Sequence, residues 1–303
     1  MTRYLIPFLF AITAQAQTFM GEAVPTGDAK LFSASIVSST LYERDFAVSK
    51  DGTEIYYSLV GGSSFARIIY RKYQNGQWSV PQALPFSSGP NDIEPALSPD
   101  GKKLFFASNR GGNFDIYVST RNTDGTWSAA TNIGSPVNTD ANEYYPSVTT
   151  DGTLYYTAAY TNGAIGGEDI WYSKWEGTGY GAPFALPQGV NSTKDEYNAF
   201  IAPSGNYILF GSFGRADDAG RGDIYMSTKN SKGVWQTAVR MDGNVNSDQL
   251  DYCPYVTGDG QFLFFTSERS VSIPRPTNPF KPKEIMKGMA TPQGGGNIFW
   301  KVF

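Results

Sequence analysis

The chain lacks histidine altogether and has a single cysteine, Cys253, among its 303 residues. Without histidine there is no Ser-His-Asp or Cys-His nucleophile and no His-ligated zinc or copper site. One cysteine cannot form a disulfide within the chain, so the fold depends on its hydrophobic core. Basic residues number 24 against 28 acidic ones, which argues against nucleic acid or an anionic membrane as the main partner.

Long apolar runs are also scarce, and the run at the N-terminus has the pattern of a secretory signal peptide. The segment MTRYLIPFLFAITAQAQ places Arg3 before an apolar stretch from Tyr4 to Ile12 and then Ala14-Gln15-Ala16, a small-x-small cleavage site. The stretch is too short to span a bilayer, and no later segment is long enough. We therefore expect residues 1–16 to be removed and residues 17–303 to fold in the periplasm or outside the cell.

Turn-forming and aromatic residues are plentiful instead. The chain has 33 Gly and 18 Pro, and 15% of its residues are aromatic, which suits short strands joined by tight turns. A turn glycine recurs at intervals of about 50 residues. Each one follows a short β-like segment and precedes an alternating, aromatic-rich one, which predicts a hairpin. These glycines are Gly52, Gly101, Gly152, Gly205 and Gly260.

Each repeat continues with a third strand, such as FDIYVST at 114–120, and a fourth that we expect to begin at an aromatic residue. These aromatic residues are Trp78, Trp127, Tyr180 and Trp235. Four strands in about 50 residues is the size of a propeller blade. The repeats therefore predict an all-β fold, a five-bladed β-propeller of four-stranded blades.

The fifth repeat lacks a fourth strand, while residues 30–39 are left over at the start of the mature chain. Phe32 in this segment precedes Glu43 much as the other four aromatic residues precede the acids of later repeats. We therefore expect residues 30–39 to complete the last blade, which closes the ring and removes exposed sheet edges. An open solenoid is the alternative, but it would need capping repeats, and the sequence shows none.

The second repeat, EPALSPDGKKLFFASNRGGNFDIYVST (94–120), resembles the PD40 (WD40-like) repeat of TolB-like propellers. The resemblance extends over nearly the whole mature chain. It is weaker in the first repeat, where Phe46 stands in place of Pro95, and in the fourth, where Ala199 stands there. TolB itself has six blades and an additional N-terminal domain, whereas we count five blades. The resemblance implies the fold far more than it implies a function.

Candidate site residues follow from the repeat. An acid stands at the same position before every turn glycine, where the innermost strand should begin at the rim of the central channel. Tyrosine follows three of these acids, and loops on the same face carry arginines. The candidate binding residues are thus Glu43, Asp92, Glu143, Glu196 and Asp251 with Tyr144, Tyr197 and Tyr252 and with Arg110, Arg215 and Arg269.

Two roles remain open for these residues. A residue type that recurs in every blade is typical of a packing role, with each acid capping backbone N–H groups or pairing with an arginine of a neighbouring blade. Alternatively, the channel mouth binds a polar ligand, a protein partner or a carbohydrate, through carboxylates and stacking tyrosines. The sequence favours a binding or scaffolding module. The alternative is a glycan-active hydrolase using two of Asp92, Glu143, Glu196 and Asp251.

No cofactor is demanded by the sequence. Calcium remains compatible with oxygen ligands from the ring acids or from Asp217-Asp218, although no ligand spacing requires it. One segment is not repeated: residues 269–296 form a long, proline-rich and basic insertion in the last repeat. Loops of this length are either functional or disordered. We expect this one to cover the channel mouth or to contact a partner.

Overall fold

Each predicted turn glycine joins two antiparallel strands in the computed structural model. Gly101, for example, has a φ of 71°, a left-handed conformation that glycine adopts without a steric penalty. It connects β9 (Asp92–Leu97) to β10 (Lys103–Ser108), whose side chains are almost all buried. The structure describes residues 17–34, 36–39, 41–61, 65–87, 91–272 and 295–303. Residues 1–16, with the expected signal peptide, and 273–294, most of the expected loop insertion, lie outside this range.

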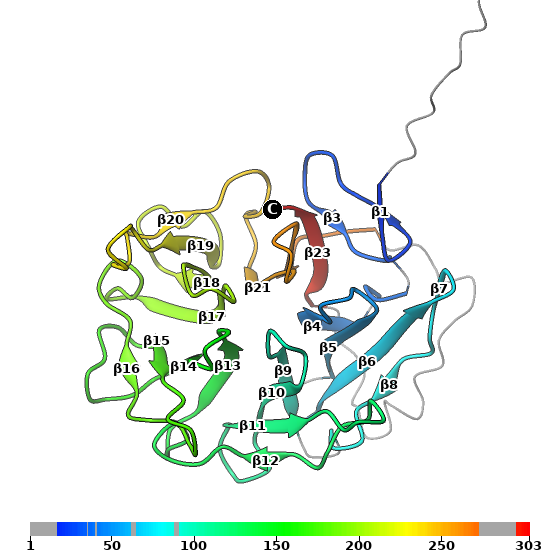
Figure 1. Ribbon diagram of the computed structural model, residues 1–303. Coiled ribbons are helices and arrows are strands. Elements are labelled where there is room, and N and C mark those ends of the chain that lie inside the picture. Colours follow the sequence, from blue (N-terminus) through cyan, green and yellow to red (C-terminus); the bar gives the residue numbers. More distant parts are fainter. Residues whose placement is uncertain (1–16, 35, 40, 62–64, 88–90, 273–294) are drawn as a thin grey trace, which may run out of the picture.

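Five sheets surround a central axis, so the predicted five-bladed propeller is confirmed (Figure 1). Blade 1 contains β4 (Tyr42–Val48), β5 (Glu54–Val60), β6 (Ala66–Gln74) and β8 (Gln82–Ala83), with β7 (Gln77–Trp78) as an extra short strand. Blade 2 contains β9, β10, β11 (Asp115–Thr120) and β12 (Thr131–Asn132), and blade 3 contains β13 (Glu143–Val148), β14 (Leu154–Ala158), β15 (Asp169–Ser173) and β16 (Phe184–Ala185). Blade 4 contains β17 (Asp195–Ile201), β18 (Tyr207–Phe213), β19 (Asp223–Thr228) and β20 (Val239–Arg240).

Blade 5 is completed by the start of the chain, as the sequence predicts. Its strands are β21 (Asp251–Val256), β22 (Phe262–Ser267), β23 (Asn297–Val302) and β3 (Lys30–Leu31). Leu31 pairs with Phe299, and the N–H of Phe32 donates to the carbonyl of Ile298 at 2.8 Å. The ring is therefore closed by hydrogen bonds between the two ends of the chain and not by a covalent link.

The outer strands begin later than we expected. The aromatic residues Trp127, Tyr180 and Trp235 form isolated bridges to residues just beyond the third strand, and Trp78 lies in the extra strand β7. The fourth strand follows them and leads into Leu84, Ile133, Leu186 or Met241, whose N–H donates to the isoleucine carbonyl of the third strand. Phe32 directly follows the outer strand β3, as Leu84 and Ile133 follow the outer strands of their blades. The predicted equivalence of Phe32 with Trp78, which precedes the outer strand, is therefore wrong, although the prediction that residues 30–39 complete the last blade is right.

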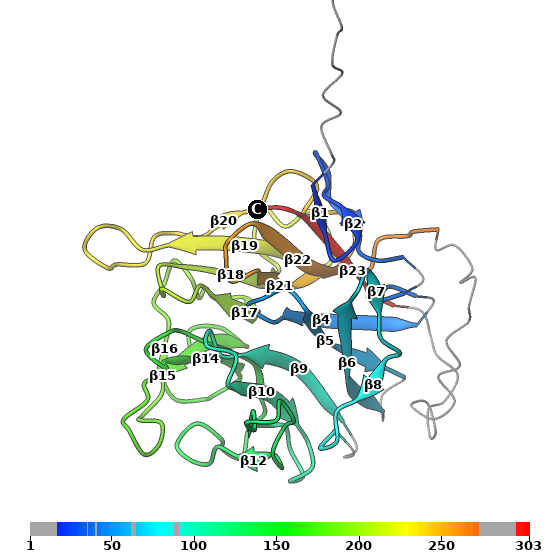
Figure 2. The same cartoon turned by 45° about the vertical axis from the view of Figure 1, so that its right-hand side comes forward.

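Apolar side chains fill the spaces between neighbouring blades. At the junction of blades 5 and 1, Phe32 is fully buried among Phe46, Phe264 and Trp300. A short hairpin of β1 (Thr18–Phe19) and β2 (Glu22–Ala23) covers the same junction and lies beside β23 (Figure 2). Its Phe19 ring lies 4.8 Å from that of Phe262. The described part of the chain contains no helix suited to crossing a membrane.

Candidate binding site at the channel mouth

The five repeated acids begin the innermost strands, but they do not project into open solvent. Each has at most 2% of its surface exposed. Such burial of a carboxylate requires compensation by hydrogen bonds or an opposite charge. The acids concerned are Glu43, Asp92, Glu143, Glu196 and Asp251.

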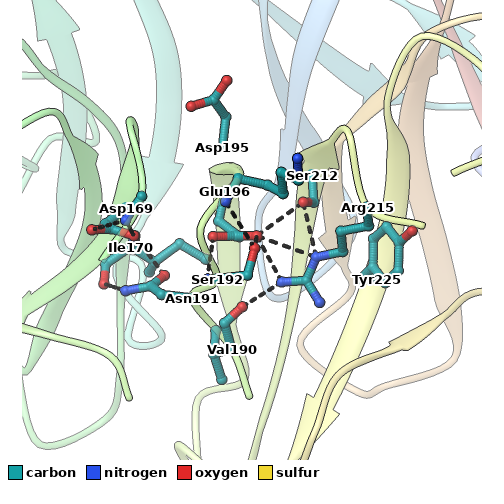
Figure 3. A network of polar contacts seen from close by, with 12 residues as sticks. Asp169, Ile170, Val190, Asn191, Ser192, Asp195, Glu196, Ser212, Arg215 and Tyr225 are labelled. Atoms are coloured by element: carbon teal, nitrogen blue, oxygen red, sulfur yellow. Dashed lines mark hydrogen bonds and ion pairs between the residues drawn. The ribbon is translucent and has the colours of Figure 1, made fainter. Parts of the chain in front are cut away.

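Three of these acids pair with the three predicted arginines (Figure 3 shows one pair). The guanidinium of Arg215 lies 2.8 Å from Glu196, and the same group donates to the carbonyl of Val190 in the connection from the preceding blade. The equivalent pairs are Arg110 with Asp92 at 2.6 Å and Arg269 with Asp251 at 2.7 Å. Each arginine belongs to the same blade as its acid and not to a neighbouring one. These ion pairs lock blades 2, 4 and 5 to the connections that lead into them.

Polar residues just before four of the acids, Glu43, Glu143, Glu196 and Asp251, complete this connection, and the sequence analysis missed them. A serine or threonine four residues before the acid donates to it from both its hydroxyl and its backbone, as Ser192 does to Glu196 at 2.6 and 2.7 Å. One position earlier, the Asn191 amide bonds both the N–H and the carbonyl of Ile170 in the preceding blade. The recurring pattern VN(S/T) at 137–139, 190–192 and 245–247 was the available signal. This geometry favours the packing role for the repeated acids.

Glu43 and Glu143 differ from the other three because no arginine pairs with them among the described residues. Glu143 accepts a bond from the Thr139 hydroxyl at 2.7 Å, and Ser39 contacts Glu43 in the same way. In blade 3, the Tyr160 hydroxyl takes the arginine's place by donating to the carbonyl of Val137 at 2.5 Å. Burial raises the pKa of Glu43 and of Glu143 to about 7, partly offset by these hydrogen bonds.

The raised pKa values predict that stability decreases as pH rises. Between the ordinary value of 4.5 and about 7, the folded state binds more protons at Glu43 and Glu143 than the unfolded chain does. The free energy of unfolding should therefore fall over this range, by roughly 1–3 kcal/mol for each group, and level off above it. Urea denaturation near pH 5 and near pH 8.5 checks the sign. Equal or greater stability at the higher pH would contradict the assignment, and Glu143→Gln should reduce the difference.

The residue two positions after each acid differs in type from one blade to the next. All five have a left-handed backbone, with φ between 48° and 63°, at or beside the β-bulge of the innermost strand. Bulges of this kind re-aim side chains and are common beside functional sites. The five residues are Asp45, Glu94, Tyr145, Asn198 and Cys253, all nearly buried. Their identities were visible in the sequence, but their unusual conformation was not.

These residues meet at the axis in a polar cluster around Arg44. The Arg44 guanidinium lies 2.7 Å from Asp45 and 3.1 Å from Glu94. The Cys253 thiol donates to Asp45 at 2.8 Å, and the Asn198 amide reaches Glu94 at 3.4 Å. Burial and the nearby Asp45 raise the pKa of Glu94 to about 8, against the opposing effect of Arg44. Burial also raises the pKa of the Cys253 thiol, so this thiol is protonated.

A hollow of about 360 Å³ opens above this cluster at the channel mouth. Two of the predicted tyrosines, Tyr144 and Tyr197, line it, and the Phe114 ring lies 5.0 Å from that of Tyr144. Glu94 and Glu168 contribute carboxyl groups, and burial raises the pKa of Glu168 as well. The hollow also receives Arg44, Ile93, Thr157 and Asn198. The third predicted tyrosine, Tyr252, is buried below Arg44, whose guanidinium lies 5.1 Å from the centre of its ring.

A metal centre finds no support in the part of the chain that the structure describes. No three side chains of the metal-binding types are grouped there as a metal ion would require. Asp217 and Asp218 accept hydrogen bonds from the Tyr225 hydroxyl at 2.8 Å and from the N–H of Gly214 at 2.9 Å, respectively.

Comparison with known proteins rests on structure, because the sequence matches no protein-family model. It matches no curated protein either. TolB from Acinetobacter baumannii is 17% identical with a TM-score of 0.50, and the match covers 78% of this chain. This chain spans only 51% of the length of that TolB. A putative TolB from Agrobacterium tumefaciens is 14% identical with a TM-score of 0.52, and 88% of this chain and 91% of that one are covered.

The chain has a TolB-like propeller fold. A similar likeness extends to an enzyme, the catalytic domain of the GH62 alpha-L-arabinofuranosidase from Coprinopsis cinerea. That domain is 12% identical with a TM-score of 0.56, and 91% of this chain and 96% of that one are covered. At such identities the likeness establishes the architecture and nothing about the reaction or the ligand.

Proposed function

We propose that this TolB-like propeller is a binding module that holds a polar ligand, a glycan or a loop of a partner protein, in the hollow at its channel mouth. The proposal includes export to the periplasm or the cell exterior, as the N-terminal sequence suggests. Both TolB-like structures in the comparison share the fold, and their likeness is compatible with this role. The repeated acids belong to the scaffold in this proposal, and Tyr144, Tyr197 and the axial side chains belong to the site.

The observation that carries the proposal is the loss of repetition at the channel mouth. The acids repeat five times because every blade needs the same connection. The residues immediately after them vary between blades, with arginine, isoleucine and three tyrosines, and Arg44, Ile93, Tyr144 and Tyr197 line one hollow. Aromatic faces together with a few convergent polar groups are typical of ligand sites. Tyrosine suits this role because its ring stacks on sugars or peptide planes while its hydroxyl donates a hydrogen bond.

A hydrolase is the second candidate, supported by one feature of the same hollow. Glu94 and Glu168 both line it, and both have raised pKa values. A glycosidase needs one carboxyl group that stays protonated near neutral pH and a second that is ionised. The acids first considered for this role, Asp92, Glu143, Glu196 and Asp251, are each completely buried. A hydrolase acting in this hollow would use Glu94 and Glu168, the two carboxyl groups among the described residues that line it.

A screen of the mature protein against glycans and candidate protein partners, with both binding and turnover measured, tests the proposal. We expect a ligand to bind without turnover and Tyr144→Ala to weaken its binding at least about ten-fold, since stacking contacts contribute 1 kcal/mol or more. Phe184→Ala is the matched control, because Phe184 is 58% exposed on the outer strand of blade 3. Unchanged affinity in Tyr144→Ala would refute the site. Turnover that disappears in both Glu94→Gln and Glu168→Gln would favour the hydrolase.

A further inference from the structure

The clefts between neighbouring blades, away from the channel, are built from equivalent positions but are filled in different ways. At most junctions, the residue at the start of the second strand in one blade, or directly before it, faces the end of the third strand in the next. Between blades 4 and 5, the rings of Tyr207 and Phe303 lie 5.6 Å apart in a tilted arrangement. Between blades 5 and 1, Phe19 inserts beside Phe262. Between blades 2 and 3, the Lys103 ammonium lies 4.9 Å from the Trp175 ring centre.

A buried carboxylate fills the cleft between blades 1 and 2. Glu54 accepts hydrogen bonds from the hydroxyls of Tyr56 at 2.9 Å and of Tyr70 at 3.1 Å. Arg121 of blade 2 lies 2.6 Å from it, and Lys72 lies 3.2 Å from it. The Arg121 guanidinium also covers the Trp127 ring at 4.5 Å. Two hydroxyls and two cations thus surround a single carboxylate.

The cleft between blades 3 and 4 repeats this arrangement without the carboxylate. The strand registers place Tyr155, Tyr172 and Lys174 where Tyr56, Tyr70 and Lys72 lie in blade 1. Likewise, Lys229 and Trp235 occupy the positions of Arg121 and Trp127, with the Lys229 ammonium 4.6 Å from the Trp235 ring centre. Thr153 stands at the position of Glu54. The N–H of Thr149 donates to the Thr153 carbonyl across the turn, just as the N–H of Ser49 donates to the Glu54 carbonyl.

The missing carboxylate leaves a hollow of about 640 Å³, lined by all of these side chains. Among the described residues, no carboxylate lies within ion-pair distance of Lys174 or Lys229, and no hydrogen bond engages the hydroxyl of Tyr155 or Tyr172. Partial burial lowers the pKa of Lys229, with Asp151 as the opposing charge. The equivalent residue in blade 1, Asp51, lies beside the cleft between blades 1 and 2, and that cleft still holds the Glu54 carboxylate. An acid at this position is therefore compatible with a second carboxylate in the cleft. The unmatched donors point to an anion that comes from outside the chain.

We propose that the cleft between blades 3 and 4 binds the carboxylate of a small organic acid. Lys229, Lys174 and the Tyr155 and Tyr172 hydroxyls hold the carboxylate as their counterparts hold Glu54, and the body of the acid lies against the Trp235 side of the cleft. Charge-assisted hydrogen bonds of this kind are among the strongest that proteins form. The site is independent of the channel-mouth hollow.

Calorimetric titration at constant ionic strength tests this site with two acids and their neutral counterparts. Glucuronate is compared with glucose, and N-acetylglycine with N-acetylglycinamide. We expect the acids to bind at least ten-fold more tightly than the neutral molecules. Binding of glucuronate alone would assign a sugar acid, and binding of both would assign the carboxylate as the main determinant. Acids that bind no better than their neutral counterparts would overturn the proposal.

Thr153→Glu provides a second, independent readout. The glutamate gives the cleft between blades 3 and 4 the carboxylate that Glu54 provides between blades 1 and 2. We therefore expect it to raise the melting temperature and to reduce acid binding at least ten-fold. Lys229→Met should also reduce binding, whereas Lys102→Met, whose lysine side chain is 77% exposed on blade 2, should not. Tyr144→Ala at the channel mouth should leave acid binding unchanged. Undiminished acid binding in Thr153→Glu would refute the site even if Lys229→Met fails to fold.

Discussion

Replacing Phe32 with alanine is expected to lower the free energy of unfolding by about 4 kcal/mol. The side chain is fully buried, and its ring lies 5.1 Å from Phe264 and 5.4 Å from Trp300 of blade 5. On the other side it meets Phe46 of blade 1 at 5.5 Å. A single residue of the N-terminal segment therefore joins the last blade to the first, and its truncation leaves a cavity at the point where the ring closes.

Urea denaturation of Phe32→Ala beside Phe184→Ala measures this effect. Phe184 is an aromatic residue in the outer strand β16, but it is 58% exposed, so we expect its truncation to cost less than about 1 kcal/mol. A loss below 1 kcal/mol in Phe32→Ala would mean that the closing segment contributes little to the fold.

The second large effect is expected at the buried acids and should differ between blades. Glu196→Gln removes the charge that pairs with Arg215, whose side chain is only 13% exposed. Leaving a nearly buried guanidinium without its carboxylate should cost about 3 kcal/mol. Glu143 has no arginine partner, and its pKa of about 7 keeps it largely protonated at pH 6. Glutamine resembles the protonated acid, so Glu143→Gln should cost about 1 kcal/mol or less at that pH.

Denaturation of both variants at pH 6 distinguishes these roles. The two acids share the same position in their blades and the same hydroxyl partner four residues earlier. The comparison therefore reports the contribution of Arg215 together with that of the Ser212 hydroxyl, which also donates to Glu196 at 3.0 Å. Equal losses in the two variants would show that the ion pair adds nothing beyond the hydrogen bonds.

The fold could be predicted from the sequence because the turn residues and the alternating apolar pattern of the strands recur in every blade. Turn glycines such as Gly101 mark the first hairpin of every blade, and the missing outer strand of the fifth repeat pointed to residues 30–39. The outer strands were misplaced because they are only two residues long and carry no alternation, as in β12. The conspicuous aromatic residues instead belong to the short turns before them.

The site was harder to predict for a physical reason. The repeated acids were the strongest pattern in the sequence. They recur because each one stabilises the connection from the preceding blade through hydrogen bonds or an ion pair. Asp45 and Glu94 carry no pattern at all, and only the left-handed backbone at each bulge brings them to the axis. The carboxylate that is absent from the cleft of blades 3 and 4 could be recognised only when strand registers aligned Thr153 with Glu54. The candidate site therefore lies where the repeats differ from one another.

The most direct test of this account compares Tyr144→Ala with Glu196→Gln, using the ligand found in the screen. We predict that Tyr144→Ala loses at least ten-fold in affinity at nearly unchanged stability. Glu196→Gln should lose about 3 kcal/mol of stability, while its folded fraction binds the ligand normally. The reverse outcome, with affinity lost in Glu196→Gln and kept in Tyr144→Ala, would place the ligand on the repeated acids and contradict the division between scaffold and site.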